Sequence, residues 1–165
     1  MSTKSEQLQI RLTSQQKSAL KGLARRAGQD VSSFVLQRVL PPARLRFEEI
    51  ARGLKNSDDV RYALAELNDL LADLTGSELA DAVAGVPPEL HALGPYLQNY
   101  VAAMVEQACY LRKVVPPAWV RQIAPLDEPH FAAPLRSLRL YLLRVAPVPF
   151  KRRNIFIDAS IGARV

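Results

Sequence analysis

The sequence predicts a mainly α-helical fold that begins with one short strand and two short helices, continues with a helical bundle or arm, and ends in a Pro-rich extended tail. Three observations lead to this class. Apolar and polar residues alternate strictly over residues 7–13, apolar residues recur every three to four positions over most of residues 14–115, and seven prolines interrupt residues 116–165. We therefore expect three parts, comprising residues 1–42, 43–115 and 116–165.

The first element is the stretch QLQIRLT, residues 7–13, which has the pattern of a half-buried strand. One face of such a strand carries the apolar residues Leu8, Ile10 and Leu12, and the other carries the polar residues Gln7, Gln9 and Arg11. A lone strand cannot satisfy its own backbone hydrogen bonds. We therefore expect a partner strand from a second copy of the chain.

Two short helices are predicted next. Thr13 and Gln16 match a capping box, so the first helix begins at about Ser14, and Gly28 is suited to end it. Asp30 can cap a second helix that stops before a pair of prolines. A unit of this size buries too little apolar surface alone. We expect a homodimer whose shared core contains Leu8, Ile10, Leu12, Leu20 and Phe34.

The segments LQIRLT, AGQD and SSFVLQRVL together resemble the ribbon-helix-helix DNA-binding family of the Arc and MetJ type, most closely the N-terminal part of bacterial antitoxins. The resemblance covers about residues 6–41 and implies a homodimer whose two-stranded ribbon enters the major groove of operator DNA. Carried over by position, the residues that read bases are Gln7, Gln9 and Arg11, and those that hold a phosphate at the start of the second helix are Val31, Ser32 and Ser33. Asp30 places a carboxylate beside that phosphate and weakens the anchor.

Residues 43–115 have the pattern of an acidic helical region. Amphipathic helices are expected over about residues 43–56 and 57–76, a shorter one over 77–85, and a long one over 88–114 that is disturbed at Gly94 and Pro95. The single Cys109 is expected to be a small core residue of the long helix.

The last part leaves room for one short helix, at about residues 134–145. It nevertheless carries aromatic and basic side chains of the kind that bind surfaces, namely Trp119, Phe131, Phe150, Lys151, Arg152, Arg153 and Phe156. Two interpretations remain open. The tail binds a partner protein, or it lies along the acidic helices of its own chain.

Charge changes sign twice along the chain. Residues 1–46 hold nine Lys and Arg against two acidic residues, residues 47–110 hold three against eleven, and residues 111–165 hold ten against three. A basic first segment suits a polyanion such as DNA. No pattern indicates a catalytic group, a metal site, a cofactor or a membrane span, so we expect a cytoplasmic protein that is not an enzyme.

The resemblance and the charge pattern together indicate an antitoxin. Such a protein represses its own operon through its N-terminal part and neutralises a toxin, such as an enzyme acting on nucleotides or RNA, through its C-terminal part. The alternatives are a repressor without a toxin partner and a pure assembly protein. A repressor that responds to a metabolite would need a ligand pocket, which the sequence does not identify.

Overall fold

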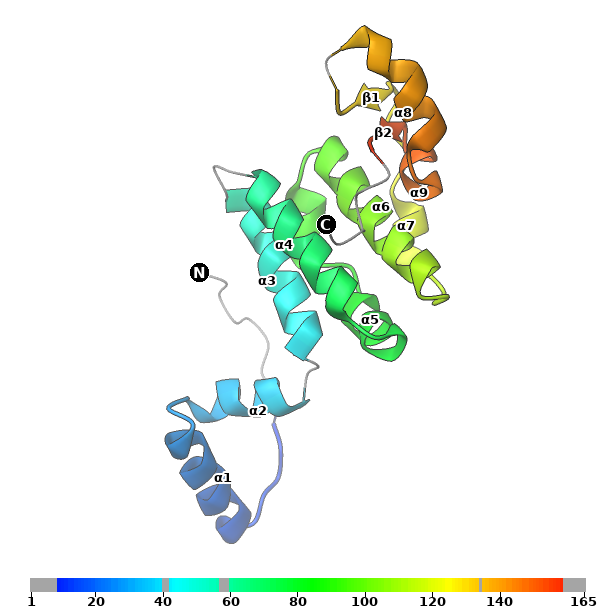
Figure 1. The fold of residues 1–165 in the computed structure, drawn as a ribbon. Helices are drawn as coiled ribbons and strands as arrows, with labels where there is room; N and C mark the ends of the chain where they lie inside the picture. Colours follow the sequence, from blue (N-terminus) through cyan, green and yellow to red (C-terminus); the bar gives the residue numbers. More distant parts are fainter. Residues whose placement is uncertain (1–8, 40–41, 57–59, 134, 159–165) are drawn as a thin grey trace. The chain divides into compact units, whose positions relative to one another are not determined.

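The computed structural model describes residues 9–39, 42–56, 60–133 and 135–158. The chain divides into two compact units, Met1–Leu40 and Pro41–Val165, which we call the N-terminal unit and the second unit. The described residues are mainly helical, as the sequence predicts (Figure 1).

The N-terminal unit consists of two helices, α1 (Ser14–Arg26) and α2 (Val31–Val39). The predicted capping box is confirmed, since the Thr13 side chain accepts from the Gln16 amide and the Gln16 side chain accepts from the Thr13 amide. Gly28 follows α1 at a φ of 67°, a conformation that glycine adopts without steric cost. Among described residues of this unit, the buried apolar side chains are Ala24 and Phe34.

The predicted N-terminal strand, and with it the ribbon-helix-helix fold class, is wrong. Residues 9–13 form no strand, and Ile10 and Leu12 are 59% and 46% exposed. The alternation supplies no neighbouring backbone to pair with, and both its apolar and its polar residues are exposed. Gln7 and Leu8 lie outside the described residues.

The first part of the second unit is a layer of helices (Figure 1). It contains α3 (Pro42–Asn56), α4 (Val60–Asp73), α5 (Gly76–Val83), the 3-10 helix η1 (Pro88–Ala92) and α6 (Pro95–Leu111). Helix α3 packs against α4, α5 and η1. Gly76 begins α5 instead of ending the preceding helix, because Thr75 and Glu78 form a capping box one residue earlier.

Helix α6 is the central element of the second unit and contacts α4, α5, α7 and α9. The long helix expected over residues 88–114 is interrupted at the dipeptide that the sequence indicates, with Gly94 as the N-cap of α6 and Pro95 in its first turn. Eight of its side chains are buried: Asn99, Val101, Ala102, Ala103, Met104, Val105, Ala108 and Cys109. The core position predicted for Cys109 is confirmed.

The expectation of an extended C-terminal tail is also wrong. This part contains α7 (Ala118–Gln122), β1 (His130–Phe131), the 3-10 helix η2 (Arg136–Leu138), α8 (Arg139–Val145), α9 (Val148–Lys151) and β2 (Ile155–Phe156). Several of its prolines lie at or just before helix starts, where the missing N–H removes no helical hydrogen bond. Pro117, for example, is the N-cap of α7, and Pro147 that of α9.

The C-terminal elements share the core of the second unit. Trp119, Val120, Phe150 and Ile155 belong to the same buried cluster as the side chains of α3 to α6. Strands β1 and β2 form a short parallel pair with His130 opposite Ile155. A smaller cluster forms beside this pair, where α8 buries Leu142 against Phe156.

Candidate nucleic-acid interface and partner-binding surfaces

The described part of the N-terminal unit is strongly basic. Residues 9–39 carry six cationic side chains against the one carboxylate of Asp30, and the six are Arg11, Lys17, Lys21, Arg25, Arg26 and Arg38. All six side chains are exposed. This unit therefore presents a positive surface to solvent.

Of the three residues predicted to read bases, two lie within the described part of the chain. Gln9 and Arg11 are both exposed, in the segment that leads into α1. Their side chains are available to a ligand, and their amide and guanidinium groups are suited to base edges.

The backbone amides predicted to hold a phosphate are at the start of α2. The amides of Ser32 and Ser33 both donate to Oδ1 of Asp30, at 2.9 and 3.0 Å, and Val31 is the first residue of the helix. Asp30 thus already satisfies two of these donors. A phosphate would have to displace a carboxylate of the same charge.

The residues predicted for the dimer core differ in exposure. Phe34 is 8% exposed, Leu20 is half-buried, and Ile10 and Leu12 are exposed, whereas Leu8 lies outside the described residues. Three further large apolar side chains of this unit are exposed, namely Leu23, Leu36 and Val39. Much of the apolar surface of the two helices is thus uncovered in the single chain.

The aromatic residues predicted to bind a partner pack inside the second unit. The Trp119 indole is 7% exposed and donates through Nε1 to the Val83 carbonyl at 2.9 Å. Phe150 is fully buried, and its ring meets that of Tyr100 edge-on with centroids 5.4 Å apart. Phe131 and Phe156 stack on each other, with centroids 4.8 Å apart. These rings are therefore committed to contacts within the chain.

The three neighbouring cations Lys151, Arg152 and Arg153 have different environments. Arg153 is 5% exposed, whereas the Arg152 side chain is 70% exposed. Lys151 donates through Nζ to the Arg144 carbonyl at 2.9 Å. The sequence motif KRR therefore does not form one charged surface patch.

Arg153, which follows α9, bonds to residues of both α6 and α7. Its guanidinium donates to Oδ1 of Asn99 at 3.1 Å on α6 and to the Val120 carbonyl at 2.6 Å on α7, and it lies 3.6 Å from the Glu106 carboxylate. Burial lowers the pKa of Arg153, and the charge of Glu106 opposes that shift. Glu106 also pairs with Arg152 at 3.2 Å.

A surface that the sequence analysis missed lies on η2 and α8. Five large apolar side chains there are 40% or more exposed, and we call them the α8 surface: Leu135, Leu138, Leu140, Tyr141 and Leu143. Three arginines accompany them, namely Arg136, Arg139 and Arg144. The available signal was that this helix carries leucines on more sides than one buried face requires. An uncovered apolar surface of this kind is typical of a binding site.

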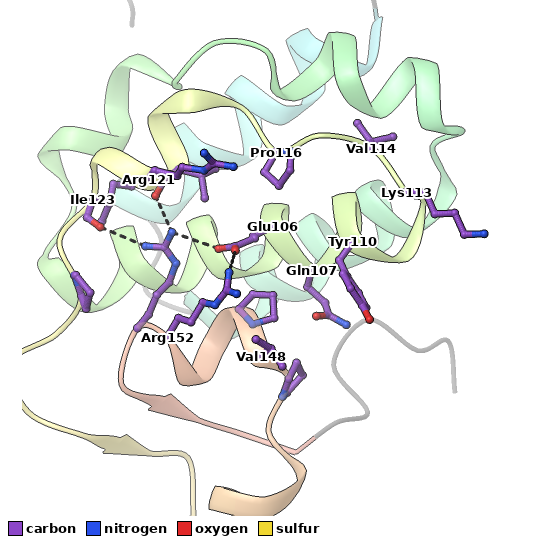
Figure 2. A pocket seen from close by; sticks show the side chains of 15 residues that line it. Glu106, Gln107, Tyr110, Lys113, Val114, Pro116, Arg121, Ile123, Val148 and Arg152 are labelled. Atoms are coloured by element: carbon purple, nitrogen blue, oxygen red, sulfur yellow. Dashed lines mark hydrogen bonds and ion pairs between the residues drawn. The ribbon is translucent and has the colours of Figure 1, made fainter.

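A cavity of about 940 Å³ lies in the second unit (Figure 2). Helix α6 lines it with Glu106, Gln107 and Tyr110. Two other segments line it from opposite sides of that helix, residues 113–125 on one and residues 147–153 on the other. We call this cavity the α6–α9 pocket.

Within the described residues, no helix is both long enough and apolar enough to cross a membrane. The same residues contain no group of three His, Cys, Asp or Glu side chains placed to hold a metal ion. No protein-family model, curated protein or solved structure matches this chain.

Proposed function

We propose that the protein is a cytoplasmic transcriptional regulator that binds operator DNA as a homodimer through its N-terminal unit. The observation that carries the proposal is the excess of six cations over one carboxylate among residues 9–39, all of them exposed. Cations at this density favour a polyanion because each phosphate contact releases a condensed counterion. The exposed Gln9 and Arg11 add groups that can contact base edges.

The homodimer is supported by the apolar surface of the same unit. Ile10, Leu12 and Val39 are 59%, 46% and 72% exposed in a unit of two helices that buries little surface of its own. A second copy would cover the apolar side chains and double the number of cations facing the DNA. Each base-reading side chain would then act twice.

The antitoxin form of this proposal adds a toxin bound by the second unit. The support is the α8 surface, where exposed leucines are flanked by arginines. A partner with an apolar patch and an acidic rim would complement it. The aromatic side chains expected to make this contact are buried or, for Phe131, half-buried in contacts within the chain, so we place the contact on Leu140 and its neighbours instead.

The DNA-binding proposal is tested by gel shifts of the full chain on DNA from upstream of its own coding region, at several salt concentrations. We expect Arg11→Ala and Gln9→Ala each to weaken specific binding by about 1–3 kcal/mol. Arg136→Ala, which removes the same charge from the second unit, is the matched control and should bind normally. If Arg11→Ala and Arg136→Ala bind alike, the N-terminal unit does not read DNA.

The toxin proposal is tested by co-purification from the native host and by rescue of growth when a captured protein is expressed. Leu140→Glu should abolish capture, because it places a charge in the apolar contact. Val148→Glu introduces the same charge at an exposed site outside the α8 surface and should leave capture unchanged. Equal capture by both variants would exclude the α8 surface as the contact.

A further inference from the structure

We propose that the α6–α9 pocket binds a small organic acid, with the apolar body of the ligand inside the pocket and its carboxylate held by Arg152 and Arg121. All of the residues that line the pocket lie between Glu106 and Arg153, in the second unit. The inference therefore goes beyond the proposed DNA binding and does not depend on it.

The size and lining of the pocket suit a small apolar ligand. Its volume of about 940 Å³ lies within the range of sites that hold drug-sized molecules. Eight of its fifteen lining residues are apolar, namely Val114, Pro116, Val120, Ile123, Pro125, Pro147, Val148 and Pro149. Val148 is 57% exposed, so part of this apolar lining is uncovered.

The charges of the lining favour an anion. The lining contains Lys113, Arg121, Arg152 and Arg153 against the single carboxylate of Glu106. Arg153 is buried and engaged with protein acceptors, but Arg152 gives only its Nη1 to Glu106. Within the described part of the chain, Arg121 pairs with no carboxylate. Two guanidinium groups therefore remain with donors for a ligand acid.

The prolines of the lining favour a small molecule over a peptide. Pro116, Pro125, Pro147 and Pro149 have no backbone N–H. A peptide that binds as an added strand needs such donors along the wall of its groove. An aliphatic or aromatic body requires none, and it gains from contact with the proline rings.

The walls of the pocket are held together by hydrogen bonds and an ion pair within the chain. Arg153 links α6 to α7 through its hydrogen bonds to Asn99 and Val120, and it pairs with Glu106 on α6. These bonds hold the two walls, residues 113–125 and 147–153, against α6. A ligand therefore does not have to order the walls when it binds, which favours affinity.

The test is isothermal titration calorimetry of the full chain with decanoate and with naphthylacetate as probes, and with decanol as the uncharged comparison. We expect saturable binding of at least one acid, with decanol at least about tenfold weaker. Arg152→Gln and Arg121→Gln should each weaken binding of the acid by about tenfold. Arg136→Gln removes an exposed arginine that does not line the pocket and should bind like the wild type.

A second pair of variants locates the ligand. Val148→Glu places a carboxylate in the pocket and should abolish binding, whereas Leu140→Glu places one on the α8 surface and should not. The fluorescence of the single Trp119, on the helix that carries Arg121, confirms that each variant is folded. The proposal fails if neither acid saturates at millimolar concentration, if decanol binds as tightly, or if both glutamate variants lose binding equally. It also fails if an acidic hexapeptide occupies the pocket in preference to both acids.

Discussion

Arg152 and Arg153 show that two identical neighbouring residues can have opposite roles. The sequence predicts both as partner-binding cations, because a run of like charges normally faces solvent. The turn after α9 buries Arg153 against Asn99 and Glu106 and leaves Arg152 exposed. Which of the two arginines is buried depends on contacts with residues about fifty positions away in the sequence, and the periodicity of apolar residues does not reveal such contacts.

We predict that Arg153→Met lowers the free energy of unfolding by about 3 kcal/mol, because it removes the cation beside Oε2 of Glu106 and the donor to Oδ1 of the buried Asn99, while Glu106 keeps only its pair with Arg152. Arg152→Met should cost less than about 1 kcal/mol, since its ion pair is exposed. Urea unfolding of the two variants measures both values. Equal losses would contradict the structural role of Arg153.

A second prediction at this scale concerns alkaline pH. Burial, with a smaller contribution from Glu106, raises the pKa of Cys109 from 9.0 to about 11, and burial with a contribution from Tyr96 raises the pKa of Tyr100 from 10.0 to about 12. Both groups are neutral when protonated, so above about pH 9 the unfolded chain loses protons first. The free energy of unfolding should therefore fall as pH rises from about 9 towards 12.

The thiol contribution can be separated from the rest by comparing the wild type with Cys109→Ala in urea at about pH 7.5 and about pH 10.5. The alanine variant should lose about 1–2 kcal/mol less than the wild type between the two conditions. An equal loss in both proteins would show that the Cys109 thiol does not ionise differently on unfolding.

At the scale of elements, local signals predict helices well and the N-terminal strand poorly. The capping box of α1 and the break before α6 depend on residues a few positions apart, so the sequence contains all that determines them. A strand depends on a second backbone, and residues 9–13 have none. The prolines of the C-terminal part suggested an extended chain, whereas several of them begin short helices.

Helix α2 offers a prediction on the balance between capping and charge. Asp30→Ala should remove the acceptor of the Ser32 and Ser33 amides, costing about 1 kcal/mol, and should speed their hydrogen exchange about fivefold. Asp30→Ser keeps a capping oxygen and removes the negative charge, so exchange should stay slow while DNA affinity rises. Amide exchange by NMR and a gel shift on the same variants measure the two effects. If the serine variant binds DNA no better than the wild type, phosphate does not approach this helix.

At the scale of the molecule, the sequence separates three parts by charge and proline content, but buried contacts connect the second part with the third. The acidic helices and the basic C-terminal part meet through Glu106 and its two arginines, and Trp119 donates to the Val83 carbonyl at the end of α5. An acidic residue of the second part and two basic residues of the third part thus pair with each other within the second unit. The α6–α9 pocket, which α6 and the C-terminal part line together, forms only where these segments meet.

The last prediction follows from this division into two units. A chain of residues 41–165 should unfold cooperatively with a midpoint within a few degrees of that of the second unit in the full protein, because no described residue before Ala43 belongs to its core or packs against it. A chain of residues 1–115 should lose that transition, since it lacks Trp119, Phe150 and Ile155 and exposes the face of α6 that they cover. Thermal unfolding by circular dichroism compares the two deletions directly. If residues 1–115 retain the transition, the C-terminal part is an attachment and the helices before it form a core on their own.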